Sequence, residues 1–177
     1  MNTKFLAFPL VCTETIWAHD TSITGTLPSE IGNLSSNLIE LRMPNTNVNG
    51  PLPSEIGKLS NLDALRLPNT RISGTIPSEM RNMASLRVLD IQLTDITGTL
   101  PADFDRLSNL ETLFVGGSSM TGVIGQDGED DDGICSLPKL QAICTTDNMK
   151  NPPNSFLGRG DITCGCSTTT GVCNCGG

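Results

Sequence analysis

The stretch TRISGTIPSE, residues 70–79, recurs along the chain at an almost constant spacing. Related copies begin at residues 21, 46, 94 and 118 and read TSITGTLPSE, TNVNGPLPSE, TDITGTLPAD and SSMTGVIGQD. Their glycines are 25, 24, 24 and 24 residues apart, at Gly25, Gly50, Gly74, Gly98 and Gly122. A period of this length is typical of stacked supersecondary units, so the stretch predicts a solenoid built from repeated coils.

Within each copy, the spacing of the apolar residues changes in a regular way. In the third unit Leu65 and Leu67 occupy alternate positions, and Ile72, Gly74 and Ile76 do the same. Alternation is the period of a β-strand, so each unit predicts two short strands. After Pro77 the apolar residues are three apart, which favours a helical turn that begins with proline. One coil should therefore contain strand, turn, strand and helical turn.

Composition restricts both the fold and the class of partner. A repeat array of 177 residues forms one elongated domain. The net charge is −8, but the acidic loop 127–132 holds five acidic residues, and without them the balance is −8 + 5 = −3. No basic stripe follows the chain, so we do not expect a nucleic-acid partner. No stretch approaches the roughly 20 apolar residues of a membrane span.

The aligned columns resemble the plant-type leucine-rich repeat, whose pattern is LxxLxLxxNxLxGxIPxxLxxLxx. Residues 38–124 match it closely and residues 13–37 loosely, and the G-x-I/L-P signature occurs four times in phase. The resemblance implies an α/β solenoid, a right-handed superhelix of about five coils with a short parallel concave sheet and helical turns on the convex side. It divides the chain into an N-terminal segment (1–12, a truncated cap or a weak signal sequence), the solenoid (13–126), and an acidic loop with a cysteine-rich C-terminal cap (127–177).

One column departs from the family pattern. Where the family has an inward asparagine, every copy of this chain has a hydroxyl residue, beginning with Thr21. An inward hydroxyl can donate to the backbone carbonyls that a turn would otherwise bury without partners. We therefore expect a structural ladder inside the solenoid, formed by Thr46, Thr70, Thr94 and Ser118.

The first strand of each unit has one outward residue between its two apolar positions. The resemblance places this position on the concave face, which receptor ectodomains and inhibitors of the family use to bind peptides or proteins. Aromatic and arginine side chains supply most of the binding energy at protein interfaces. The expected ligand-binding residues are Trp17, Arg42, Arg66, Asp90 and Phe114. The alternative is a row of solvated positions in which Arg66 pairs with Asp90 across adjacent strands.

The second strand of each unit carries an outward row that is rich in threonine and serine, although Pro51 interrupts it. A regular hydroxyl array can match an ice lattice. An ice-binding or surface-adsorbing structural protein is therefore the alternative function, on the analogy of the fold. The hydroxyl residues of this row are Thr24, Thr26, Ser73, Thr75, Thr97, Thr99 and Thr121.

Six of the seven cysteines lie in the last 43 residues. This clustering indicates a disulfide-stapled end and an oxidising, extracellular compartment. The spacing C-x-C-x6-C-x-C resembles secreted repeat proteins of single-celled algae. The last four thiolates also fit a zinc site, but the secreted character of the family favours three disulfides among fifteen possible pairings. The disulfide candidates are Cys135, Cys144, Cys164, Cys166, Cys173 and Cys175, and Cys12 is left over.

Three shorter motifs carry weaker predictions. Asn33 begins an Asn-Leu-Ser sequon on an expected surface loop and is a glycosylation candidate. The acidic loop 127–132 lacks the glycine spacing of an EF-hand, so we expect a solvated loop in preference to a calcium site. The RGD tripeptide at 159–161 is too short to identify an adhesion motif.

Catalysis has no support in the residues, because His19 is the single histidine and no nucleophile or phosphate loop stands at a recognisable spacing. We expect a non-enzymatic recognition module without cofactor or metal, resembling a receptor ectodomain or an inhibitor. Its expected partner is an extracellular protein, peptide or polysaccharide, and its expected location is outside the cell or at the cell surface. The oligomeric state stays open.

Overall fold

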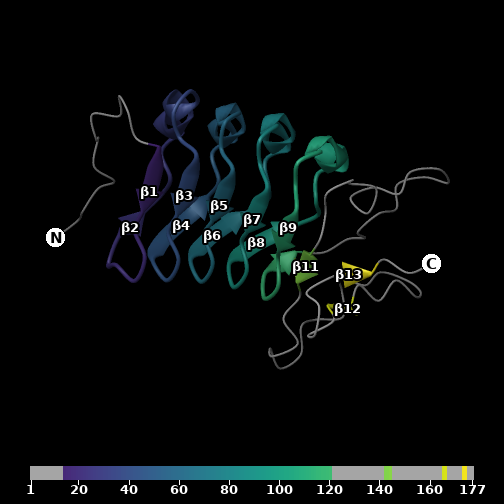
Figure 1. The fold of residues 1–177 in the computed structure, drawn as a ribbon. Coiled ribbons are helices and arrows are strands. Elements are labelled where there is room, and N and C mark those ends of the chain that lie inside the picture. Colours follow the sequence, from purple (N-terminus) through teal and green to yellow (C-terminus); the bar gives the residue numbers. More distant parts are fainter. Residues whose placement is uncertain (1–13, 121–141, 145–164, 167–172, 175–177) are drawn as a thin grey trace.

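The chain winds into successive coils that stand side by side (Figure 1). The computed structural model describes residues 14–120, 142–144, 165–166 and 173–174. Each complete coil contains a short strand, a turn, a second short strand and a 3₁₀ turn, in the order that the apolar spacing predicted. The predicted solenoid is confirmed, and its helical element is of the 3₁₀ type.

The first strands of the coils form one parallel sheet, which we call the concave sheet. Its strand order follows the chain, so each strand pairs only with strands of neighbouring coils. Equivalent positions lie in register, with Leu41 opposite Leu65 and Leu65 opposite Leu89. The six strands are β1 (Thr15–Trp17), β3 (Glu40–Arg42), β5 (Ala64–Arg66), β7 (Val88–Asp90), β9 (Thr112–Phe114) and β11 (Ala142–Cys144).

The second strands form another parallel sheet, which we call the second sheet, and the 3₁₀ turns gather along one side of the coils (Figure 1). Each 3₁₀ turn begins directly after a proline; Pro77, for example, has a φ of −63°. The second sheet contains β2 (Thr24–Gly25), β4 (Asn47–Pro51), β6 (Arg71–Gly74), β8 (Asp95–Gly98) and β10 (Ser119–Met120). The 3₁₀ turns are η1 (Ser29–Leu34), η2 (Ser54–Lys58), η3 (Ser78–Asn82) and η4 (Ala102–Arg106).

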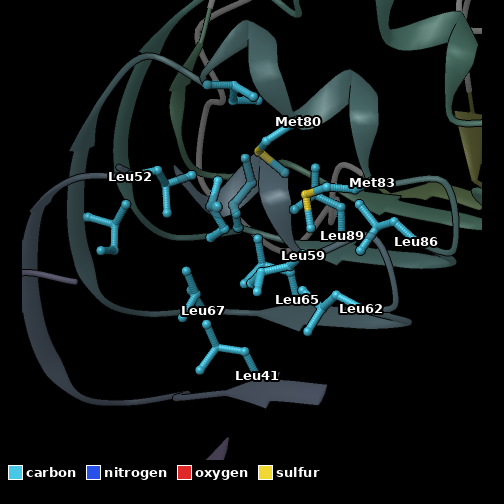
Figure 2. Packing of buried hydrophobic residues seen from close by; sticks show 14 of the residues in the cluster. Leu41, Leu52, Leu59, Leu62, Leu65, Leu67, Met80, Met83, Leu86 and Leu89 are labelled. Carbon is cyan, nitrogen blue, oxygen red and sulfur yellow. The ribbon is translucent and has the colours of Figure 1, made fainter. Parts of the chain in front are cut away.

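Leucine, isoleucine and methionine side chains fill the inside of the coils. Leu65 and Leu67 enter this core from the strand side, and Met80 and Met83 enter it from the side of η3 (Figure 2). All four are fully buried, and burial of a side chain of this size contributes about 1.5–3 kcal/mol. Because each coil buries its apolar side chains only against its neighbours, the same core also couples one coil to the next.

The repeated glycine of the copies is required by backbone conformation and by space. Gly50 has a φ of +75°, in the left-handed region that favours glycine. A Cβ atom added to Gly50 would lie 2.8 Å from the methyl carbon of Thr26 in the preceding coil. The period of the glycines therefore follows from a turn and from a close contact between coils.

An amide ladder on the outside of the turns was not predicted. Asp20, Asn45 and Asn69 have positive φ angles of 52°, 55° and 54°, which aspartate and asparagine tolerate better than other residues with a side chain. Asn45 donates from Nδ2 to Asp20 Oδ1 at 2.7 Å, and Asn69 donates to Asn45 Oδ1 at 2.8 Å. The repeated Pro-Asn-Thr at 44–46 and 68–70 is the sequence signal that could have revealed this ladder.

The concave sheet continues beyond the five copies of the repeat. β11 pairs in parallel with β9, and Ile143 lies opposite Leu113. This strand falls inside 127–177, the part that the sequence assigned to the acidic loop and cap. The sequence did not predict this sixth strand, because its spacing departs from the period of the repeat. Ala142 follows its register partner Thr112 by 30 residues instead of the usual 24.

The last described element is a short antiparallel pair, β12 (Gly165–Cys166) and β13 (Cys173–Asn174). Both strands contact β11, beside which they lie in Figure 1. Several sequence predictions concern residues outside the described ranges. They are the segment 1–12, Thr121 of the hydroxyl row, the acidic loop 127–132, the RGD tripeptide 159–161, Cys12, Cys135, Cys164 and Cys175.

Candidate functional site

The five residues predicted for ligand binding form one continuous row across the concave sheet. The register places Trp17, Arg42, Arg66, Asp90 and Phe114 opposite one another in that order. Each of them ends its strand. Because neighbouring strands are about 4.8 Å apart, the row is roughly 19 Å long. We call these five residues the concave row.

The N-terminal end of the concave row is a cluster of three linked side chains. Trp17 is 65% exposed, and Cζ of Arg42 lies 5.4 Å from the centroid of its ring, a cation–π contact. Glu40 accepts a hydrogen bond from Trp17 Nε1 at 3.3 Å and another from Arg42 Nη2 at 2.8 Å. Glu40 therefore orients the exposed indole and partly neutralises the charge of Arg42.

The centre of the concave row contains hydrogen-bond donors that no protein group uses. Among the described residues, the buried Nε atoms of Arg42 and Arg66 have no hydrogen-bond partner. A buried donor without a partner costs about 1–3 kcal/mol, so native proteins rarely leave one. In the same part of the chain no carboxylate forms an ion pair with Arg66, its register neighbour Asp90 included. The charge of Arg66 is therefore not compensated by a carboxylate within these residues.

Asp90 is the acidic residue of the concave row, and its surroundings disfavour the charged form of its carboxyl. It is 8% exposed, and this burial raises the pKa of its carboxyl above the usual range. A hydrogen bond from the backbone N–H of Gln92 at 3.3 Å and the charge of Arg66 oppose the rise without cancelling it. The concave row thus combines two arginines with one buried acid whose charged form is disfavoured by its surroundings.

The C-terminal end of the concave row is aromatic and then continues into β11. Phe114 is half-buried, in contrast to the exposed Trp17 at the other end. In the backbone register Cys144 lies opposite Phe114. The row therefore has an aromatic side chain at each end and its unsatisfied donors between them.

Three of the four predicted inner hydroxyl residues are buried and Ser118 is partly buried, and each hydrogen bond stays within its own coil. Thr70 is 6% exposed and donates to the carbonyl of Leu67, three residues earlier, at 2.9 Å. Thr46, Thr94 and Ser118 make the same contact at 3.0, 2.7 and 2.7 Å. Thr21, which the sequence alignment put in this column, is exposed. The hydroxyls stack from the second copy onward, but no bond joins one of them to the next.

The hydroxyl row of the second sheet is exposed but chemically mixed. Thr75 and Thr99 point to solvent, and Thr97 donates from Oγ1 to the carbonyl of Gly74 at 3.2 Å. Arg71 and Asp95, both exposed, are the first residues of β6 and β8 in this sheet. The face therefore offers hydroxyls interrupted by charges instead of a uniform lattice.

A groove of 610 Å³ lies where the strands of the concave sheet begin, and sequence reasoning missed it. None of the concave-row residues lines it. Apart from Ile39, which is 41% exposed, the residues that line it are of polar or acidic types. The only sequence signal is the Ser-Asn pair that precedes the strands, such as Ser36–Asn37. The lining residues are Glu14, Ser36, Asn37, Ile39, Asn61, Asp63 and Ser85.

The remaining predictions add no further site in the described ranges. Asn33 lies exposed within η1. Of the disulfide candidates, Cys144, Cys166 and Cys173 are placed by their backbone strands alone. Within the described residues no three histidine, cysteine, aspartate or glutamate side chains gather as metal ligands would. The same residues contain no helix with the length and hydrophobicity of a membrane span.

No protein-family model and no curated protein sequence matches the chain. Solved structures do match it. The leucine-rich-repeat ectodomain of the receptor kinase SOBIR1 from Arabidopsis thaliana is 30% identical, with a TM-score of 0.64, and the match covers 72% of this chain and 65% of that one. The plant peptide hormone receptor RGFR1, solved in complex with RGF2, is 28% identical with a TM-score of 0.61, covering 73% of this chain and 24% of that one.

A plant ice-binding protein is also similar, at 25% identity and a TM-score of 0.59, with 63% of this chain and 36% of that chain covered. This chain therefore spans about two thirds of the SOBIR1 ectodomain and a smaller share of the other two proteins. The three similar proteins include two receptors and one ice-binding protein. The shared feature is the repeat fold, so the ligand has to be argued from the residues of this chain.

Proposed function

The chain is a plant-type leucine-rich-repeat protein, and we propose that it is a non-enzymatic recognition module that binds a protein or peptide through the concave row. The chemical group that the row favours is an acid. The observation that carries the proposal is Arg66 at the centre of the row, whose partly exposed side chain forms no ion pair among the described residues. A guanidinium recognises a carboxylate through two parallel hydrogen bonds, so an acidic group on a ligand would pair with the charge of Arg66.

The aromatic ends of the row support the same proposal. Trp17 offers a large exposed surface held in place by Arg42 and Glu40, so little side-chain entropy is lost when a partner covers it. Tryptophan and arginine are the residue types that most often dominate binding energy at interfaces. A segment that spans the row would place apolar contacts at Trp17 and Phe114 and an acidic group between them.

The similar structures support a binding role in general terms. RGFR1 is a peptide hormone receptor solved with RGF2, and SOBIR1 is represented by a receptor ectodomain. For this chain we propose the same class of work, outside the cell or at its surface. The clustered cysteines of the C-terminal part also favour an oxidising compartment.

The experiment is a selection of random displayed peptides on the immobilised full chain, followed by calorimetric titration of a synthetic selected peptide. We expect the selected peptides to be rich in aspartate and glutamate. Arg66→Ala should weaken their binding about tenfold or more, because it removes a charge-assisted hydrogen bond. Arg71→Ala is the matched control, since Arg71 is exposed on the second sheet, and it should change the affinity less than about twofold. Equal effects of the two substitutions, or selected peptides without acids, would contradict the proposal.

Ice binding through the second sheet is a second candidate, favoured by the exposed hydroxyls of Thr75, Thr97 and Thr99 and by the similarity to a plant ice-binding protein. We place it below peptide binding because the charged Arg71 and Asp95 stand on the same sheet. Thermal hysteresis of the purified chain tests it directly. If this function holds, Thr99→Lys abolishes the hysteresis and Arg66→Ala leaves it unchanged; absence of hysteresis in the unsubstituted chain rules it out.

A further inference from the structure

The C-terminal antiparallel pair brings two cysteines directly opposite each other. The register of β12 and β13 sets Gly165 against Asn174 and Cys166 against Cys173. Residues directly opposite in an antiparallel pair have Cα atoms about 4.5–5.5 Å apart. A disulfide needs a Cα separation of about 4.4–6.8 Å, a range that includes the separation typical of directly opposite residues.

The size of the element indicates why a covalent link would be needed there. β12 and β13 have two residues each, and an isolated two-stranded hairpin is at best marginally stable in water. The pair nevertheless lies against β11, the last described strand of the concave sheet. A cross-link between the two strands would hold this small element in place at the C-terminal end of the sheet.

We propose that Cys166 and Cys173 form a disulfide bond that closes this hairpin. Only the six residues 167–172 separate the two cysteines, so the chain-entropy cost of bringing them together is small. The proposal does not depend on what the concave row binds. It selects one bond among the pairings that the sequence leaves open, and it assigns the two cysteines to a structural link instead of a zinc site.

The oxidant is a small disulfide such as glutathione disulfide, or the active-site disulfide of a thiol oxidoreductase. The thiolate of Cys166 attacks one sulfur of that disulfide, forms a mixed disulfide and expels the other sulfur as a thiolate. The thiolate of Cys173 then attacks the Cys166 sulfur and expels the second thiolate. The two cysteines lose two protons and two electrons in total, and the oxidant becomes two thiols.

The positions of the basic residues make peptide mapping informative. Trypsin cleaves after Lys139, Lys150 and Arg159, so Cys135 and Cys144 fall in separate peptides while residues 160–177 keep the last four cysteines together. The full chain is folded with a glutathione redox buffer, blocked with N-ethylmaleimide at mildly acidic pH to limit exchange, and digested without reduction. A further thermolysin cut within 167–172 of the unsubstituted chain should yield two fragments joined through Cys166 and Cys173.

A variant identifies the partner independently. In Cys166→Ser, the newly free thiol that reacts with N-ethylmaleimide should be Cys173, as located by peptide fragmentation. Cys144→Ser is the matched control, and there Cys173 should stay unlabelled. A label that is absent from the unsubstituted chain and falls on any cysteine other than Cys173 in Cys166→Ser overturns the proposal. Labelling of both Cys166 and Cys173 in the unsubstituted chain, as free thiols or a zinc site would give, overturns it as well.

Discussion

Leu93 occupies a backbone position that suits it poorly. Its φ is +57°, the left-handed conformation that the equivalent Asn45 and Asn69 adopt in the preceding coils. For a residue with an apolar side chain this conformation costs about 1–2 kcal/mol, whereas asparagine tolerates it. Leu93 is also 39% exposed, so its burial offsets only part of that cost.

We expect Leu93→Asn to raise the free energy of unfolding by about 1 kcal/mol. The new amide can donate to Asn69 Oδ1 and extend the ladder that runs from Asp20 through Asn45. Urea unfolding measures the change. Leu93→Ala is the control, because alanine removes the apolar side chain and keeps the unfavourable φ. If alanine stabilised the chain as much as asparagine, backbone strain would not be the cause.

Asp90 predicts a dependence of stability on pH. Its pKa is raised in the folded chain by burial, so the native state holds the proton more tightly than the unfolded state does. The stability that the protonated carboxyl contributes is complete below the ordinary pKa of 3.8 and is lost as the pH rises through the folded-state pKa. At neutral pH the buried carboxylate therefore lowers the free energy of unfolding.

Asp90→Asn should remove this pH-dependent decrease in the free energy of unfolding, because asparagine carries no charge. We expect the variant to be more stable than the unsubstituted chain at pH 7, with the advantage shrinking toward zero as the pH falls to 3.8 and below. The measurement is the free energy of urea unfolding at several pH values. Asp95→Asn, at an exposed position of the second sheet, controls for the change in net charge. If the difference in stability between the two proteins did not vary with pH, the ionisation of a buried Asp90 would not be its cause.

The 3₁₀ turns stack so tightly that one glycine in η2 cannot carry a side chain. A Cβ atom on Gly57 would overlap the carbonyl group of Glu79 in η3, and it would lie 2.7 Å from Glu79 Cβ. The clash is with backbone, so no rotamer change relieves it. Gly32 faces Glu55 in the same way but with more room, at 2.9 Å from the carbonyl oxygen.

Gly57→Ala should therefore lower the free energy of unfolding by about 1–3 kcal/mol, and Gly32→Ala should lower it less. The exposed neighbour Lys58→Ala serves as the control, and we expect a change within about 0.5 kcal/mol. Denaturant midpoints measured under identical conditions give the order of the three variants. A Gly57→Ala protein as stable as Lys58→Ala would mean that neighbouring turns can separate without cost.

How far sequence predicts these elements depends on whether the signal is local. The alternation of Leu65 and Leu67 and the proline at 77 report local backbone preferences, and both strands and turns formed where they were expected. β11 was missed because its spacing departs from the period, although its pairing with β9 is regular. The period of the repeat also predicted that the five residues of the concave row occupy equivalent positions, and the strand register places them so. The burial of Asp90 and the unpartnered Nε atoms arise from contacts between coils, which no single coil encodes.

The whole molecule is a linear array in which the central coils have two neighbours and the first described coil has one. β5 pairs with both β3 and β7, whereas β1 pairs only with β3 among the described strands. Leu65 on β5 is fully buried, and Ile16 on β1 is partly buried against the same core. In such arrays stability is approximately the sum of each repeat and its interfaces with its neighbours.

We therefore expect the cost of a core truncation to depend on its place along the array. Leu65→Ala should lower the free energy of unfolding by about 2–5 kcal/mol, because it opens a cavity that two interfaces share. Ile16→Ala removes a similar volume at the first described strand and should cost less than half as much. Urea unfolding of the two variants, monitored by circular dichroism, gives the comparison. Equal losses would mean that the N-terminal strand is as firmly coupled as the centre, and that stability here is not set by the number of neighbouring coils.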